Sequence, residues 1–296
     1  MSESMLTRDV MVERPITVRP DADLVHAVQI LMKHRITGAP VVNAQGHYCG
    51  VFSERSILEV ASKWLHEKRS ELTAIPTALG VMTSKLVTLC PEEDVMEGIG
   101  RLLKSKISGA PVIGVEGQFC GVFSEKTSMT AVLQSAFDQV PGGRVSAFID
   151  SDPVRLIAPE TTLHQLVDKF LNSPFRRLIV FDGGVSGMIS RRDVVRKVMQ
   201  MIVDYGPGAA FRNTVDLVTQ THAATIMPDD DLLNVAQVFQ QSNFRRLPVV
   251  VERKLLGQLS RRDVLAAFYR ILQPKSESKE QLLYLSTLHR REDVPI

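Results

Sequence analysis

Two similar stretches in the second half of the chain concentrate side chains that can bind an anion. Each has an Arg-Arg pair and then a Ser-x-x-Asp pattern that opens an apolar helix: Arg176, Arg177, Ser190 and Asp193 in one, and Arg245, Arg246, Ser260 and Asp263 in the other. The planar guanidinium group suits phosphate. The Ser-x-x-acid spacing is also that of a capping box, which only stabilises a helix start, and paired arginines often lie on a solvated surface. Their coincidence in one half of the chain favours a phosphate site.

Other kinds of chemistry find little support in the residue pattern. Seven histidines are scattered along the chain, and the three cysteines, Cys49, Cys90 and Cys120, form no CxxC pair. A metal site or a disulfide framework is therefore not expected. No GxSxG, GxxxxGK[ST] or GxGxxG motif occurs. We expect no catalytic residue, no metal, no required cofactor and no enzyme activity.

Composition narrows the class of protein further. The 296 residues are 44% hydrophobic and 23% charged, which is ordinary for globular domains. The net charge of +2, from 35 basic and 33 acidic side chains, argues against nucleic acid as a partner. No apolar run approaches the roughly 18 residues that span a bilayer, and the first residues resemble no signal peptide. A cytoplasmic location, away from membranes, is the expectation.

Internal repetition organises the whole chain. Four prolines, each followed 31 to 33 residues later by a serine, mark equivalent points of four repeats: Pro20 and Ser53, Pro91 and Ser124, Pro159 and Ser190, Pro228 and Ser260. A repeat of about 70 residues therefore occurs four times, and repeats have to be recognised before any other feature is interpreted. The chain is long enough for about two domains.

Each repeat predicts the same secondary structure. After the proline, apolar residues at helical spacing indicate an amphipathic helix, as with Leu24, Ala27, Val28 and Leu31. Two apolar strands joined by a Gly- or Asp-rich turn follow, and a second helix begins after the serine. A short strand before the proline completes a β-α-β-β-α unit of the α+β class. Because such a unit cannot cover its own sheet, neighbouring units should pair sheet against sheet.

These repeats resemble cystathionine-beta-synthase (CBS) domains, with "TVRPDADLVHAVQILMKHRITGAPVVNAQGHYCGVFS" as the clearest example. The resemblance covers roughly residues 5–270. It implies two Bateman modules in a pseudo-symmetric disc: residues 1–138 with repeats one and two, residues 139–273 with repeats three and four, and a C-terminal tail at 274–296. It also implies a regulatory, ligand-sensing protein whose clefts take AMP, ADP, ATP or S-adenosylmethionine.

The resemblance assigns the ligand mainly to the second module. The family's signature is Ser or Thr followed three residues later by Asp, whose carboxylate can accept hydrogen bonds from both ribose hydroxyls. Repeats three and four have this pattern, whereas Ser56 and Thr127 take the Asp position in repeats one and two. The loss of two charge-assisted hydrogen bonds, about 1.5 to 3 kcal/mol each, would weaken a nucleotide by orders of magnitude.

A further family position is the Thr three residues before the marker proline. It is present as Thr17, Thr88 and Thr225, but repeat three has Leu156 there. The cleft of repeat four is therefore the better candidate. Its expected ligand contacts are Thr225, Arg246, Ser260 and Asp263, with Arg177, Ser190 and Asp193 for repeat three and Arg176, Arg245, Thr17 and Thr88 as secondary positions.

Other functions remain open at this stage. The clefts could hold S-adenosylmethionine, or the chain could be a scaffold or partner-binding protein without any nucleotide. The first module could serve as a face for a homodimer. A regulatory function also requires a regulated protein, which the sequence does not identify.

Overall fold

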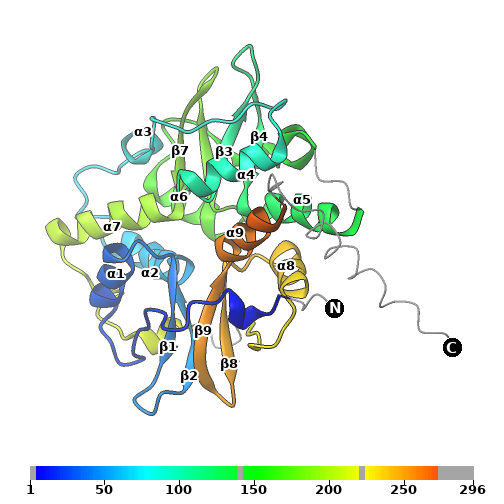
Figure 1. The fold of residues 1–296 in the computed structure, drawn as a ribbon. Helices are drawn as coiled ribbons and strands as arrows, with labels where there is room; N and C mark the ends of the chain where they lie inside the picture. Colours follow the sequence, from blue (N-terminus) through cyan, green and yellow to red (C-terminus); the bar gives the residue numbers. More distant parts are fainter. Residues whose placement is uncertain (1–4, 139–142, 220–223, 273–296) are drawn as a thin grey trace.

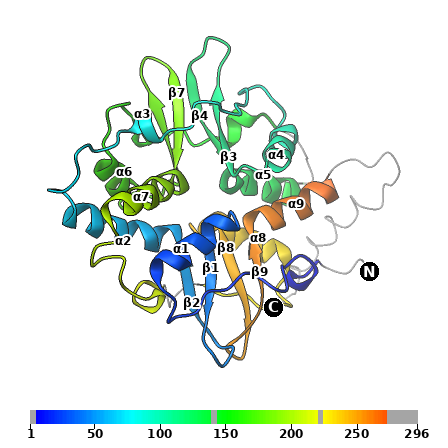
Figure 2. The same cartoon turned by 90° about the vertical axis from the view of Figure 1, so that its left-hand side faces the viewer.

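The four predicted repeats are present as four similar units. The computed structural model describes residues 5–138, 143–219 and 224–272. The predicted C-terminal tail, residues 274–296, lies outside the described residues. Figures 1 and 2 show helices across the middle of the molecule and β-hairpins at its two ends.

Every repeat consists of a helix, a β-hairpin and a second helix, as predicted. Repeat one contains α1 (Leu24–Lys33), β1 (Gly38–Val42), β2 (Tyr48–Ser53) and α2 (Glu54–Glu67). Repeat two contains α4 (Val95–Lys104), β3 (Gly109–Ile113), β4 (Phe119–Ser124) and α5 (Glu125–Asp138). Repeat three contains α6 (Leu163–Leu171), β6 (Arg177–Phe181), β7 (Val185–Ser190) and α7 (Arg191–Tyr205). Repeat four contains α8 (Leu232–Gln241), β8 (Arg246–Val251), β9 (Lys254–Ser260) and α9 (Arg261–Leu272).

Short elements connect the repeats. They are η1 (Thr7–Asp9), α3 (Ala78–Val81), η2 (Val145–Phe148), η3 (Pro153–Arg155) and η4 (Val215–Val218). The predicted opening strand of repeat three is β5 (Leu156–Ile157), which pairs in parallel with β6. The equivalent residues of the other repeats form single parallel bridges: Val18 to Val41, Leu89 to Val112, and Ile226 to Val249.

The first helix of each repeat begins where its sequence supplies a cap. The side chains of Asp23, Asp94, Thr162 and Asp231 accept hydrogen bonds from backbone N–H groups of the helix that follows. Such caps satisfy amide groups that have no partner within a helix. The apolar face predicted for the first repeat, Leu24 with Ala27, Val28 and Leu31, is buried.

Helices join repeats that are not consecutive in the chain. Helix α2 packs against α6 and α7, so repeat one shares a hydrophobic core with repeat three. Helix α5 packs against α8 and α9, so repeat two shares a second core with repeat four. Trp64 and Phe170 are fully buried in the first core, and Phe123 and Phe239 in the second. These layers fix the middle of the molecule.

Sheets join the repeats in a different combination. The hairpin β1-β2 lies beside β8-β9, where the Tyr48 N–H donates to the Arg253 carbonyl at 2.8 Å and His47 bridges to Lys254. At the other end, β3-β4 lies beside β7 (Figures 1 and 2). Repeat one is therefore the sheet neighbour of repeat four, and repeat two that of repeat three.

The predicted modules, residues 1–138 and 139–273, each pair two repeats that are consecutive in the chain. The described sheet contacts join repeats that are paired differently. The segments that precede the first helices of repeats one and two are the physical reason, because each extends onto the sheet of another repeat. Val12 bridges to Gln258 of repeat four, and Thr83 bridges to Met188 of repeat three. The arrangement keeps two sheet-paired modules, but the modules join repeats one with four and two with three.

A disulfide can test this pairing. Facing residues of an antiparallel pair have Cα atoms about 5 Å apart, which suits a disulfide. We expect the His47→Cys/Lys254→Cys double variant, with the three native cysteines replaced by serine, to form an intramolecular bond on oxidation. Non-reducing electrophoresis would show it as a faster-moving monomer. The matched pair His47→Cys/Gln118→Cys, between hairpins at opposite ends of the molecule, should stay reduced. A bond in the second pair and none in the first would contradict the arrangement.

Candidate functional site

A cavity of about 260 Å³, here cavity A, lies where repeats one, three and four meet. Its lining residues are Thr37, Gly38, Val51, Ser53, Arg55, Ser173, Pro174, Arg176, Arg191, Asn243, Phe244, Arg245 and Arg246. Five of these are arginines, and none of the described lining residues is acidic. A concave site lined by several cations and by no acidic residue is suited to a negatively charged ligand.

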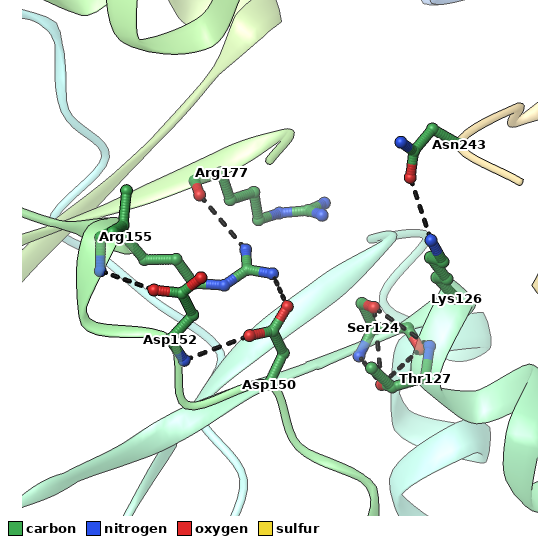
Figure 3. A network of polar contacts seen from close by, with 9 residues as sticks. Ser124, Lys126, Thr127, Asp150, Asp152, Arg155, Arg177 and Asn243 are labelled. Atoms are coloured by element: carbon green, nitrogen blue, oxygen red, sulfur yellow. Dashed lines mark hydrogen bonds and ion pairs between the residues drawn. The ribbon is translucent and has the colours of Figure 1, made fainter. Parts of the chain in front are cut away.

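A smaller cavity of about 70 Å³, here cavity B, lies where repeats two, three and four meet. Its lining residues are Ser108, Val122, Ser124, Glu125, Lys126, Arg155, Pro174, Phe175, Arg176, Arg177, Asn243, Arg245 and Arg261. Figure 3 shows Arg155 between Asp150 and the Arg177 carbonyl, and Lys126 donating to Asn243 Oδ1 at 3.0 Å. Burial disfavours the charged carboxylate, but the bond to Arg155 leaves the pKa of Asp150 below its ordinary value.

The two cavities are built from equivalent residues of different repeats. Repeat one gives Thr37, Val51, Ser53 and Arg55 to cavity A, and repeat two gives Ser108, Val122, Ser124 and Lys126 to cavity B. The Arg-Arg pair comes from the sheet neighbour in each case, repeat four for cavity A and repeat three for cavity B. Repeats one and two, which lack the Ser-x-x-Asp pattern, thus each contribute residues to one of the two cavities.

Two buried glutamates hold one arginine of each pair. Glu54, the first residue of α2, lies 3.5 Å from Arg176 and 3.2 Å from Arg192 of repeat three. Glu125 lies 3.4 Å from Arg245 and 3.1 Å from Arg262 of repeat four. The glutamate side chains are only 8% and 3% exposed. These ion pairs link repeat one to three and repeat two to four, and they give the secondary positions Arg176 and Arg245 a structural function.

Arg177 and Arg246, the second residues of the pairs, have no acidic partner in the described part of the chain. Arg177 Nη2 bonds to Ser108 Oγ, and Arg246 Nη1 donates to Gln258 Oε1 at 3.3 Å. The Nε groups of both arginines are buried and unpartnered among the described residues. Burial, followed by repulsion from Arg245, lowers the pKa of each to about 10. Both stay charged at neutral pH, and an anion would offset that repulsion.

The arginines that begin α7 and α9 bind the ends of other helices. Arg191 Nη2 donates to the Phe170 carbonyl at 2.9 Å, and Arg261 Nη2 donates to the Ser242 carbonyl at 2.7 Å. Cations at helix C-termini are favourable because of the helix dipole. Burial and repulsion from neighbouring arginines, Arg176 first among them, lower the pKa of Arg191 to about 10 and that of Arg261 to about 9.

The Ser-x-x-Asp pairs form capping boxes. The N–H and Oγ of Ser190 both donate to Asp193 Oδ2, at 2.9 and 2.6 Å, while Asp193 Oδ1 accepts from Arg196. Ser260 makes the same two bonds to Asp263 Oδ2. Asp263 Oδ1 has no hydrogen bond or ion pair to another described residue, in contrast to Asp193 Oδ1. None of these four residues lines cavity A or B.

The predicted threonines lie apart from the two cavities. Thr17, Thr88 and Thr225 are exposed and line neither cavity. The structure therefore brings Arg176, Arg177, Arg245 and Arg246 together and leaves the predicted hydroxyl and carboxylate groups beside them or farther away. Sequence reasoning missed Glu54, Glu125, Ser53 and Lys126. The sequence did contain a signal for the two glutamates. Repeats one and two share a Ser-Glu pair at the end of the second strand, and its glutamate occupies the position of Arg191 and Arg261.

The chain belongs to the CBS domain family. That family matches it four times, at residues 8–63, 78–127, 145–200 and 215–270, and these segments make up most of the chain. This confirms the predicted family and the class of four mixed helix and strand repeats. CBS domains are regulatory units, and no catalytic domain was matched. Every helix in the described part of the chain is too short or too polar to cross a bilayer.

Several known proteins are similar to this chain. Uncharacterized protein MJ1225 of Methanocaldococcus jannaschii is 24% identical over 272 residues, 86% of this chain and 95% of that protein. Its crystal structure aligns with a TM-score of 0.41 at 21% identity, over 89% of this chain and all of that one. MJ1426 of the same organism is 34% identical over 106 residues, 36% of this chain and 60% of that protein. The crystal structure of CBSX2 from Arabidopsis thaliana with AMP aligns at 25% identity with a TM-score of 0.38, over 42% of this chain and 97% of that one.

The buried glutamates give a stability prediction. Glu125→Gln removes the negative charge that Arg245 and Arg262 share, and a buried charge left unpaired is costly. We expect the free energy of unfolding in urea to fall by about 3 kcal/mol. This value is at the low end of the cost of breaking a buried ion pair, because both arginines are partly exposed. Glu116→Gln, in the exposed turn of the same repeat, is the control and should change it by less than about 0.5 kcal/mol. Equal, small effects would show that Glu125 is not needed as a counter-charge.

Proposed function

We propose that this chain is a regulatory, non-catalytic protein that binds an adenine nucleotide, AMP, ADP or ATP, with its phosphate on Arg246 in cavity A. The observation that carries this proposal is the charge of cavity A, which five arginines line without an acidic residue among those described. Of these arginines, Arg191 and Arg246 each have a buried Nε group without a hydrogen-bond partner among the described residues. A phosphate accepts several hydrogen bonds from such donors.

The ribose can be placed by the residues next to Arg246. In the β8-β9 ladder Arg246 faces Ser260, and Asp263 is close enough that its charge acts on the Arg246 guanidinium. The unpartnered Oδ1 of Asp263 can accept a hydrogen bond from a sugar hydroxyl while Oδ2 keeps its capping bonds. In repeat three the second oxygen is already taken by Arg196. This difference supports repeat four as the nucleotide site.

The same charge argues against S-adenosylmethionine as the ligand. Its sulfonium group is a cation, and a second cation beside unpaired arginines would be repelled. A nucleotide phosphate is attracted for the same reason. Tetrahedral phosphate oxygens also match the fork of a guanidinium, whereas a sulfonium accepts no hydrogen bond. The scaffold alternative, in which the site holds nothing, leaves Arg191 and Arg246 without an acidic partner among the described residues, whereas Arg55, Arg176 and Arg245 are each paired with a glutamate.

Regulation would follow from the position of the site. Cavity A takes its lining from three repeats, and Arg176 and Arg245 in its wall also hold the glutamates that join the repeats. A ligand shifts an arrangement only as far as it binds one arrangement better than another. A phosphate that draws Arg176 or Arg245 from its glutamate would change how the repeats pack. A partner protein that contacts two repeats could respond to that change.

Calorimetric titration with AMP tests the nucleotide function. We expect saturable binding to the full chain and a loss of one charge-assisted hydrogen bond in Arg246→Gln, which raises the Kd roughly 10- to 150-fold. Arg253→Gln, in the exposed β8-β9 turn, is the control and should bind as the unmodified chain does. AMP at 100 times Kd should also stabilise the fold by about 2.7 kcal/mol. No heat and no stabilisation with AMP, ADP or ATP would favour the scaffold alternative.

The carboxylate of repeat four gives a separate prediction. Asp263→Ala should weaken AMP binding far more than Ser56→Ala, because Ser56 takes the equivalent position in repeat one without a charge. Affinity has to be measured by calorimetry rather than by thermal shift, since loss of the capping box alone costs about 1 kcal/mol of stability. Equal Kd values for the two variants would mean that Asp263 serves only the helix start.

A further inference from the structure

We propose that cavity B is a separate site for a small tetrahedral oxyanion, with free orthophosphate as its occupant. This site goes beyond the nucleotide of cavity A and does not require it. It lies where repeats two, three and four meet, and its cations come from all three.

The size of cavity B selects the ligand class. Its volume is about 70 Å³, and a water molecule takes up about 30 Å³ in the liquid. The space therefore accommodates roughly two waters or one phosphate ion. Cavity A is several times larger, at about 260 Å³. The two cavities thus differ in size although their residues are equivalent.

Donor groups converge on cavity B from three repeats. Among the described residues, the buried Nε groups of Arg177 and Arg261 have no hydrogen-bond partner. Ser108 Oγ, which bonds to Arg177 Nη2, can donate its own proton to an oxyanion because a hydroxyl both donates and accepts. Lys126 Nζ adds an ammonium group at the same wall. Four donors of this kind can surround a tetrahedral anion.

A glycine allows Arg177 to reach this position. Arg177 crosses from the sheet of repeat three to that of repeat two, where a Cβ atom at Gly109 would lie only 3.1 Å from its Nη1. The same Cβ would lie 2.9 Å from the Phe123 carbonyl oxygen, which the hairpin holds in place. A side chain at residue 109 would therefore disturb both the hairpin and the guanidinium. The backbone of repeat two makes room for a cation from another repeat.

The charges around cavity B do not balance without an anion. Glu125 is shared by Arg245 and Arg262, and Asp150 pairs with Arg155. Within the described residues, Arg177, Arg261 and Lys126 have no salt bridge. Burial and the repulsion of Arg261 lower the pKa of Lys126, which shows that these cations crowd one another. An oxyanion supplies the missing negative charge.

Orthophosphate titration tests the proposal on the full chain. We expect calorimetry in chloride buffer of matched ionic strength to show saturable binding of sodium phosphate. Lys126→Gln should raise the Kd for phosphate at least tenfold, because one charge-assisted bond is lost. Arg55→Gln changes the equivalent residue of cavity A and should leave the Kd within about twofold. Ser108→Ala provides a second variant if Lys126→Gln does not fold.

The outcomes separate this site from the nucleotide site. Phosphate binding that is lost in Arg55→Gln and kept in Lys126→Gln would place the anion in cavity A and overturn the proposal. If sodium chloride stabilised the fold as much as sodium phosphate at the same ionic strength, phosphate would act only by screening surface charge. That result would also overturn the proposal. If AMP fails to bind while phosphate binds through Lys126, the nucleotide function fails and the oxyanion site stands. If AMP binds and phosphate does not, the oxyanion site fails and the nucleotide function stands.

Discussion

The structure depends on two buried glutamates, each of which holds two arginines of another repeat. Glu54 and Glu125 begin the second helices of repeats one and two, and they bind the arginines of repeats three and four at the centre of the molecule. A buried charge is tolerated only when it is paired and hydrogen-bonded. The glutamates therefore determine how the helix layers of the two halves meet, and how much positive charge is left over.

The remaining positive charge defines the two cavities and connects them. Arg176 and Arg245 line both cavity A and cavity B, and each is tied to one glutamate. If anions occupy both cavities, each would attract the arginines of the shared wall, and binding at one site would change the affinity of the other. Coupling of this kind is reciprocal between two ligands. A regulatory protein could use it to respond to a nucleotide and to phosphate together.

Much of the fold could be predicted because it is local and repeated four times. The marker prolines, the helical spacing from Leu24 to Leu31 and the caps such as Asp94 each act within one repeat, where the sequence contains the whole interaction. The pairing of repeats could not be predicted, since contacts such as His47 with Lys254 join residues far apart in the chain. The site was predicted in part. Arg177 and Arg246 were recognised by type, whereas Glu54 and Glu125 matter only through arginines that lie on other repeats. Asp193 and Asp263 were expected to contact a ribose, and that contact stays a prediction because both carboxylates form capping boxes.

A crystal structure of the full chain grown with AMP tests the central claim most directly, because it locates the ligand and the arginines together. We expect density for AMP with phosphate oxygens within hydrogen-bonding distance of the Arg246 guanidinium in cavity A and a ribose hydroxyl at Asp263 Oδ1. Density for AMP elsewhere, or an empty cavity A in crystals saturated with AMP, would contradict it.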